Sequence, residues 1–144
     1  MASPRVTYIE DETLRNTNYR QVIYTGKFQL VLMSLMPGED IPEEVHMELD
    51  QFIRVESGKG TLTLWKGDLS TNADEYLLED GVSVFIPAGI RHYIKNTDSK
   101  DPLKLYTIYS GPEHSPNRID VEKPLKVNEG PIIIERSGVI HEIY

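Results

Sequence analysis

Two separated stretches of the chain carry carboxylate, imidazole and amide side chains that could bind a metal ion. The first, residues 38–60, contains Glu44, His46 and Gln51, and the second, residues 81–96, contains His92. Imidazole nitrogens and side-chain oxygens are typical ligands of divalent transition metals. The chain has no cysteine, which excludes thiolate ligands and cysteine nucleophiles. These residue types predict metal chemistry rather than nucleophilic catalysis.

The spacing in the first stretch predicts two strands joined by a turn. Glu44 and His46 are two residues apart, so on a strand they leave the same face. Gln51 follows His46 at an odd offset, which would point it away on one regular strand. A turn or bulge is therefore expected within residues 47–50, and Gln51 begins a second strand over residues 51–57.

The second stretch predicts how His92 joins this set. The turn formed by Pro87-Ala88-Gly89 precedes His92 and can direct its side chain inward at the start of a strand over residues 91–96. If the turn in the first stretch falls elsewhere, Glu48 and Asp50 are the substitute ligands.

These two stretches resemble the paired motifs of the cupin superfamily, G-x5-H-x-H-x3,4-E-x6-G and G-x5-P-x-G-x2-H-x3-N. The second motif matches in full, at Gly81, Pro87, Gly89, His92 and Asn96. The resemblance covers roughly residues 28–109, and two spaced motifs in the right order make it specific. It implies a metal-binding jelly-roll barrel in which Asn96 is a structural residue at a strand end.

The first motif matches in spacing and departs in residue type. Glu44 stands where cupins usually have a histidine, Gln51 stands where they usually have the glutamate, and His46 is the expected ligand. The resemblance implies that Glu44, His46, Gln51 and His92 bind one divalent ion, which would be Fe, Mn, Ni or Zn. Without Gln51, the other three form the 2-His-1-carboxylate set that suits non-haem Fe(II).

Several functions are compatible with such a site. The first hypothesis is a metal-dependent enzyme of isomerase or dioxygenase type, acting on a small polar or sugar-like molecule inside the barrel. The alternatives are a non-catalytic binding or sensing module with a structural or vestigial metal, and a metal-free barrel similar to sugar-nucleotide epimerases. His114 could approach the barrel mouth as an acid or base, although a surface-loop histidine is the simpler interpretation.

The strand pattern predicts an all-β, antiparallel jelly-roll barrel without using the resemblance. Short segments rich in apolar and β-branched residues alternate with Gly, Pro and Asp turns, and no helical repeat of useful length occurs. Residues 60–81 predict a hairpin with a polar tip at 68–73. The segment 84–86 is expected to be buried on both sides.

The chain is expected to fold as one domain, because 144 residues suffice for one core and not for two ordinary domains. We divide it into an N-terminal segment (1–20), the barrel (21–110) and a C-terminal extension (111–144). The extension contains one predicted strand, residues 131–136, which should pair with a sheet edge of the same chain or of a partner. A homodimer is therefore possible.

Charge and composition limit the partners. With 15 basic and 23 acidic residues, the net charge of −8 argues against a nucleic-acid partner. The N-terminal residues form neither a signal-peptide core nor a membrane span. By elimination we expect a cytoplasmic protein that binds a small molecule.

Overall fold

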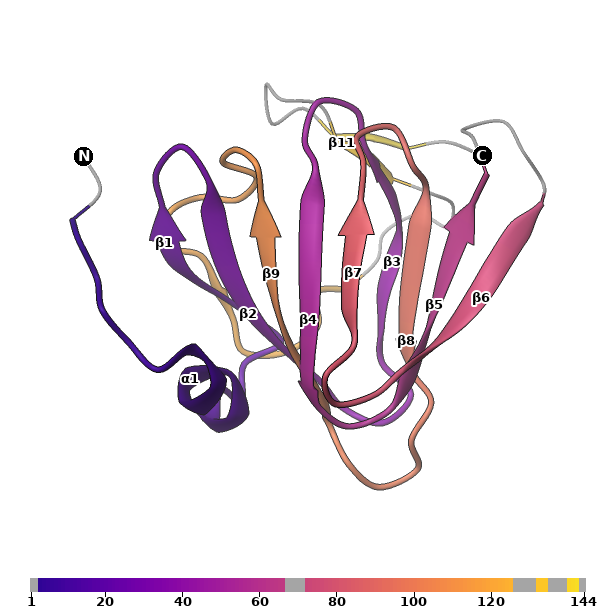
Figure 1. The fold of residues 1–144 in the computed structure, drawn as a ribbon, viewed down its shortest axis with the longest axis horizontal. Coiled ribbons are helices and arrows are strands. Elements are labelled where there is room, and N and C mark those ends of the chain that lie inside the picture. Colours follow the sequence, from indigo (N-terminus) through magenta and orange to yellow (C-terminus); the bar gives the residue numbers. More distant parts are fainter. Residues whose placement is uncertain (1–2, 67–71, 126–131, 135–139, 143–144) are drawn as a thin grey trace.

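Two six-stranded β-sheets face each other in the computed structural model, which describes residues 3–66, 72–125, 132–134 and 140–142 (Figure 1). The strands are β1 (Arg20–Thr25), β2 (Gln29–Leu35), β3 (Asp40–His46), β4 (Gln51–Ser57), β5 (Gly60–Trp65), β6 (Ala73–Leu78), β7 (Ser83–Ile86), β8 (His92–Asn96), β9 (Leu103–Tyr109), β10 (Ile119–Asp120), β11 (Ile132–Ile134) and β12 (Ile140–Glu142).

The first sheet has the order β10-β1-β2-β9-β4-β7, and the second has the order β12-β11-β3-β8-β5-β6. The strand pairs are antiparallel except for β11, which runs parallel to β3. This arrangement confirms the predicted all-β jelly roll in a single domain. The sheets converge below and open above in the view of Figure 1.

The space between the sheets is filled by inward-facing side chains that alternate along the strands. In β9, Leu105, Thr107 and Tyr109 are buried, whereas Tyr106 and Ile108 face outward. The lumen face of this strand, which the sequence left open, is thus the face of Leu105. Ile53 on β4 and Leu62 on β5 also belong to the core, which continues through both sheets. A continuous apolar core of this kind is the main stabilising term of such a barrel.

A short helix, α1 (Ile9–Arg15), lies in the segment where no helix was predicted. Its seven residues are too few to show a repeat in the sequence. Lys104 of β9 donates hydrogen bonds to the carbonyls of Leu14 (2.7 Å) and Asn16 (2.8 Å), which satisfies acceptors at the end of this helix. Tertiary contacts therefore hold the helix in place.

Two further predictions differ from the structure: the burial of residues 84–86, and the number of strands after residue 110. Residues 84–86 are not buried on both sides, because Phe85 is 74% exposed and only Val84 and Ile86 face the core. β7 is one of the two edge strands of the first sheet, and its outer face has no layer over Phe85 in the described part of the chain. An apolar triplet resembled a strand buried on both faces because the sequence does not show which face of a sheet is covered.

In its described residues, the segment after residue 110 contains three strands, where one was predicted. The predicted strand appears as β11. It pairs with β3 of the same chain, which is one of the two predicted arrangements; the other was pairing with a partner chain. β12 continues that sheet, and β10 extends the opposite one beside β1. The hairpin of β5 and β6 is confirmed, and residues 68–71 of its predicted tip lie outside the described residues.

Among the described residues, no helix has the length and apolar character needed to cross a membrane.

Candidate metal centre

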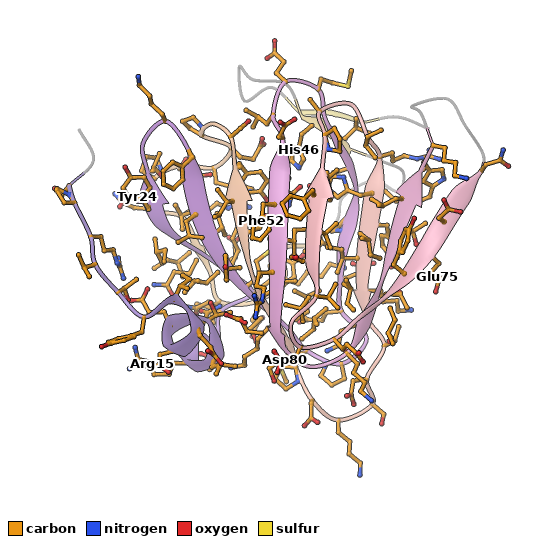
Figure 2. The ribbon with its side chains drawn as sticks, viewed as in Figure 1. Arg15, Tyr24, His46, Phe52, Glu75 and Asp80 are labelled. Atoms are coloured by element: carbon orange, nitrogen blue, oxygen red, sulfur yellow. The ribbon has the colours of Figure 1, made fainter. Side chains whose placement is uncertain are left out.

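Strand register brings the predicted ligands to one end of the barrel. Glu44 of β3 is paired with His92 of β8, which is paired in turn with Leu64 of β5. Because directly paired residues on one face have neighbouring side chains, Glu44 and His92 point together into the barrel. Figure 2 places His46 at the upper end of the molecule, with Asp80 at the opposite end.

Glu44, His46 and His92 form a compact cluster of possible metal ligands. One ligand atom from each lies within 4.8 Å of the others. Oε1 of Glu44 is 3.3 Å from Nε2 of His46 and 3.4 Å from Nε2 of His92. Both imidazoles are buried, whereas the Glu44 side chain is 13% exposed and leaves the cluster in contact with solvent. The geometry matches a 2-His-1-carboxylate arrangement.

The turn before β8 fixes the orientation of His92. The backbone N–H of Gly89 donates to the carbonyl of His46 at 2.8 Å, and Gly89 has the positive φ of 86° that this turn requires. Nδ1 of His92 lies 3.0 Å from the carbonyl of Ile90, so that nitrogen carries the proton. Nε2 of His92, the other ring nitrogen, lies 3.4 Å from Oε1 of Glu44. It is buried and makes no hydrogen bond to the described residues.

Gln51 lies at the same end, on the opposite sheet. Its register partners are Tyr109 on β9 and Ile86 on β7. Nε2 of Gln51 donates to Oγ1 of Thr107 at 2.9 Å, and its buried Oε1 has no hydrogen-bond partner among the described residues. The predicted turn over residues 47–50 is present, because β3 ends at His46 and β4 begins at Gln51.

The structure adds one residue that the sequence did not indicate. Oε2 of Glu113 is 3.3 Å from Nδ1 of His46, and the Glu113 side chain is only 3% exposed. Glu113 follows β9, the last strand of the barrel, and no sequence pattern indicates that this segment returns to the site. The sequence offered only its position beside His114.

These two carboxylates change the protonation of His46. Burial by itself would lower the pKa of His46, but Glu44 and Glu113 together raise it to about 10. Burial likewise opposes ionisation of Glu44, and the adjacent His46 and His92 nonetheless hold its pKa well below the usual range. Without a metal, the site therefore contains an ion pair between buried groups, and a divalent cation would replace the proton as the positive charge.

His114 is half-buried, and the ring of Tyr109 lies between it and the cluster. Its ring packs against Tyr109 at 5.7 Å between centroids, and Tyr109 in turn packs against His46 at 5.3 Å. Burial and the nearby Arg20 and Arg118 lower the pKa of His114 to about 3. The ring is thus neutral at pH 7, and the structure brings its neighbour Glu113, not His114, to the cluster.

The substitute carboxylates do not join the cluster. Glu48 is exposed, and Asp50 accepts a hydrogen bond from the backbone of Ala88 at 2.9 Å. Asn96 occupies the other end of β8, where Nδ2 donates to the carbonyls of Leu35 (2.9 Å) and Asp101 (3.0 Å). Its contacts are those of a structural residue.

Several proteins are similar to this chain over most of its length. It is 46% identical over 127 residues to an uncharacterized protein of Acanthamoeba polyphaga mimivirus, covering 87% of this chain and 76% of that protein. It is 41% identical to the uncharacterized protein YrkC of Bacillus subtilis, covering 77% of this chain and 59% of that protein.

Among solved structures, BH2720 of Bacillus halodurans is 41% identical, with a TM-score of 0.74 over 83% of this chain and 89% of that one. TT1209 of Thermus thermophilus shares the fold at 20% identity, with a TM-score of 0.60 over 72% of this chain and 94% of that one. Residues 31–109 match the family described as the Cupin domain, close to the span of the two sequence motifs. The paired motifs, the double-sheet barrel and these matches agree, and the chain belongs to the cupin family.

Proposed function

We propose that this cupin is a metal-dependent enzyme that binds one divalent transition metal through Glu44, His46 and His92 and acts on a small polar molecule at the barrel mouth. The observation that carries the proposal is the convergence of both histidine Nε2 atoms on Oε1 of Glu44, at 3.3 and 3.4 Å. Two neutral imidazoles and one carboxylate suit Fe, Mn, Ni or Zn.

The residues present fit a metal on chemical grounds. Three buried polar atoms at this end, Nδ1 of His46, Nε2 of His92 and Oε1 of Gln51, make no hydrogen bond to the described residues, and the latter two are free to bind a cation. Buried polar atoms without partners are unfavourable, and a cation would satisfy them. Gln51 is therefore proposed as a fourth ligand through its amide oxygen, which keeps the total ligand charge at −1 with Glu44 as the only carboxylate.

A bound divalent ion would polarise a substrate oxygen and acidify a coordinated water. The chain's own residues supply the surroundings. Tyr109 packs against His46, and burial raises the pKa of its phenol, so this wall of the site carries no negative charge at neutral pH. The 13% exposure of Glu44 leaves an entry from solvent, while the buried histidines are shielded from water.

A partial match supports one substrate class as the first to test. The chain is 27% identical over 93 residues to part of a mannose-1-phosphate guanylyltransferase of Salmonella montevideo, although these residues are only 18% of that enzyme. We therefore propose sugars and sugar phosphates as the first substrates to test. Either isomerisation or oxidation by dioxygen would be compatible with the ligand set.

A second candidate function is a non-catalytic binding or sensing module. The observation in its favour is that the acid–base groups nearest the cluster are already engaged: Glu113 contacts His46, and His114 is neutral with a pKa of about 3. A metal in such a module would stabilise the fold and would not turn over substrate.

The test of the metal site is metal content by plasma emission on protein purified without a metal-binding tag. About one equivalent per chain is expected, and His46→Ala and His92→Ala should lose it while retaining the far-ultraviolet circular dichroism of the native protein. Glu44→Gln should lose it as well, and Glu48→Gln, an exposed carboxylate nearby, is the matched control. Unchanged metal content in both histidine variants would exclude the site.

Turnover then separates the two functions. An enzyme should convert at least one sugar or sugar phosphate in a metal-dependent way. A binding module should show a large metal-induced increase in Tm and no conversion, since tight binding to the native state alone raises stability.

A further inference from the structure

Gln29 is a fully buried amide at the start of β2, on the inward face and in register with Tyr109. Its side chain makes four hydrogen bonds. Oε1 accepts from the backbone N–H groups of Glu113 (3.0 Å) and His114 (2.9 Å). Nε2 donates to the carbonyl of His114 (2.8 Å) and to Oγ1 of Thr25 (2.9 Å). Three of these bonds therefore hold the backbone of residues 113–114.

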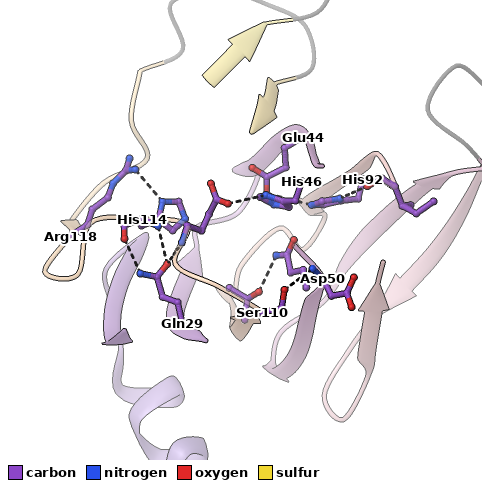
Figure 3. A network of polar contacts seen from close by, with 12 residues as sticks. Gln29, Glu44, His46, Asp50, His92, Ser110, His114 and Arg118 are labelled. Carbon is purple, nitrogen blue, oxygen red and sulfur yellow. Dashed lines mark hydrogen bonds and ion pairs between the residues drawn. The ribbon is translucent and has the colours of Figure 1, made fainter. Parts of the chain in front are cut away.

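This backbone segment is what carries the Glu113 carboxylate to His46. Figure 3 shows the connection from Gln29 to the segment and on to the cluster of Glu44, His46 and His92. The side chains of Gln29 and Glu113 are both buried, so the contact is formed inside the barrel and not on a surface loop.

A second set of polar contacts, made by Arg118, lies just beyond this segment. Nη1 of Arg118 is 3.2 Å from Nδ1 of His114, and Nε of Arg118 is 3.1 Å from Oδ2 of Asp120 on β10. Hydrogen bonds of Gln29 thus connect residues 113–118 to β2, and the contacts of Arg118 connect them to β10. The hydrogen bonds of Gln29 are made at Glu113 and His114, whereas the contact with β10 lies several residues further along the chain.

We propose that Gln29 is a positioning residue of the metal centre, acting through Glu113. By holding residues 113–114, it sets the Glu113 carboxylate against Nδ1 of His46, and His46 then presents Nε2 towards Glu44 and His92. The inference rests on the proposed metal site, and it adds Gln29 as the residue that orients the ligand His46.

The physical reason is the unfavourable burial of a carboxylate. Glu113 is 3% exposed, and a carboxylate leaves water only when its surroundings compensate for the lost hydration. A free backbone at residues 113–114 would allow this side chain to turn to solvent. His46 would then lose the carboxylate that lies 3.3 Å from its Nδ1 and limits the rotation of its ring. Loss of such a partner to a metal-bound histidine weakens metal binding by about 10- to 100-fold.

The test is Co²⁺ affinity by chelator competition, with the Co²⁺ absorption spectrum as a second readout, on wild type, Gln29→Leu, Glu113→Ala and the double variant. Each single variant is expected to bind about 10- to 100-fold more weakly. Because Gln29 acts through Glu113, the double variant should bind no more weakly than Glu113→Ala. Glu113→Gln keeps an acceptor facing Nδ1 of His46 and should recover part of the affinity and the wild-type spectrum.

Asn96→Leu is the matched control, since Asn96 is also a buried amide that clamps a loop, at the far end of β8. It should lower Tm comparably and leave Co²⁺ affinity unchanged. If Gln29→Leu does not fold, Gln29→Glu retains an acceptor for the two N–H groups and is expected to lose less affinity than Glu113→Ala.

Three kinds of result would overturn the inference, and they can be distinguished. Wild-type affinity in Gln29→Leu, or a double variant that adds both losses, refutes the role of Gln29 and leaves the metal site standing if His46→Ala abolishes Co²⁺ binding. A wild-type protein that binds no Co²⁺ refutes the proposed function together with this inference. Equal weakening by Asn96→Leu would show a general effect of stability and would also overturn it.

Discussion

The amide N–H of Gln51 donates a hydrogen bond to the hydroxyl of Thr107 on the neighbouring strand β9 at 2.9 Å. The amide oxygen of Gln51 is buried and has no hydrogen-bond partner among the described residues. The amide at this position is therefore oriented as an acceptor, as a metal ligand has to be.

Replacing Gln51 by glutamate tests that orientation. Gln51→Glu adds a second carboxylate to the proposed ligand set, so apo-protein Tm should fall because a buried charge loses hydration, and divalent-metal affinity should rise by about tenfold or more. Gln51→Leu should weaken binding. Thermal unfolding with and without Co²⁺, together with chelator competition, measures both effects. Identical affinities in the three proteins would remove Gln51 from the ligand set.

Acid should destabilise the metal-free protein in part through His114. Burial, with Arg20 and Arg118 nearby, lowers the pKa of His114 to about 3 in the folded chain, below its ordinary value of 6.5. The unfolded chain therefore takes up the proton first, and stability present above pH 6.5 is lost as the pH falls towards 3. The loss attributable to this group has a slope of up to about 1.4 kcal/mol per pH unit.

His114→Gln is the comparison for that titration, because it removes the imidazole while keeping a polar side chain. Urea unfolding between pH 7 and 4, in the presence of a chelator, should show a shallower decline for this variant than for wild type. Other groups titrate in both proteins and cancel in the difference. Parallel curves would mean that His114 is not held neutral by the fold.

Asn96 should matter to stability and not to metal binding. Its amide donates to the carbonyls of Leu35 and Asp101, and Oδ1 accepts from the N–H of Asp98 at 2.8 Å. Asn96→Ala leaves these groups without their partner, and the free energy of unfolding should fall by about 2–4 kcal/mol. Urea denaturation measures the loss. A drop in metal content of the folded variant would contradict a purely structural role.

Gly58 should tolerate no side chain, unlike Gly38. Both have positive φ, 92° and 83°. A Cβ on Gly58 would lie 2.3 Å from the carbonyl oxygen of Pro102, whereas a Cβ on Gly38 meets nothing within 4 Å. Gly38→Ala should reduce stability by about 1 kcal/mol from its backbone conformation alone. Gly58→Ala should reduce it by several times as much, because backbone atoms of two segments must move apart.

Denaturant midpoints of these two alanine variants provide the comparison. Equal losses would show that the segment containing Pro102 can shift without penalty.

The sequence by itself predicted most of the barrel, and of the four ligands it proposed, Glu44, His46 and His92 lie together in a cluster that could hold a metal ion. Alternating apolar residues and closely spaced turns define strands locally, so β4 and β5 begin and end where the pattern indicates. Glu44 and His46 share a face because a strand has a two-residue period, and His92 follows a turn whose glycine requires positive φ. These are local rules, and a single sequence contains the information they need.

Only the tertiary structure determined what depends on which segments meet. Phe85 is exposed because it lies on the outer face of its sheet, and an apolar triplet has the same sequence whether one face of its strand is covered or both. Glu113 reaches His46 because the chain returns to the barrel mouth, where Gln29 holds its backbone. No local pattern encodes that return. It depends on long-range hydrogen bonds that exist only once β2 and β9 have paired.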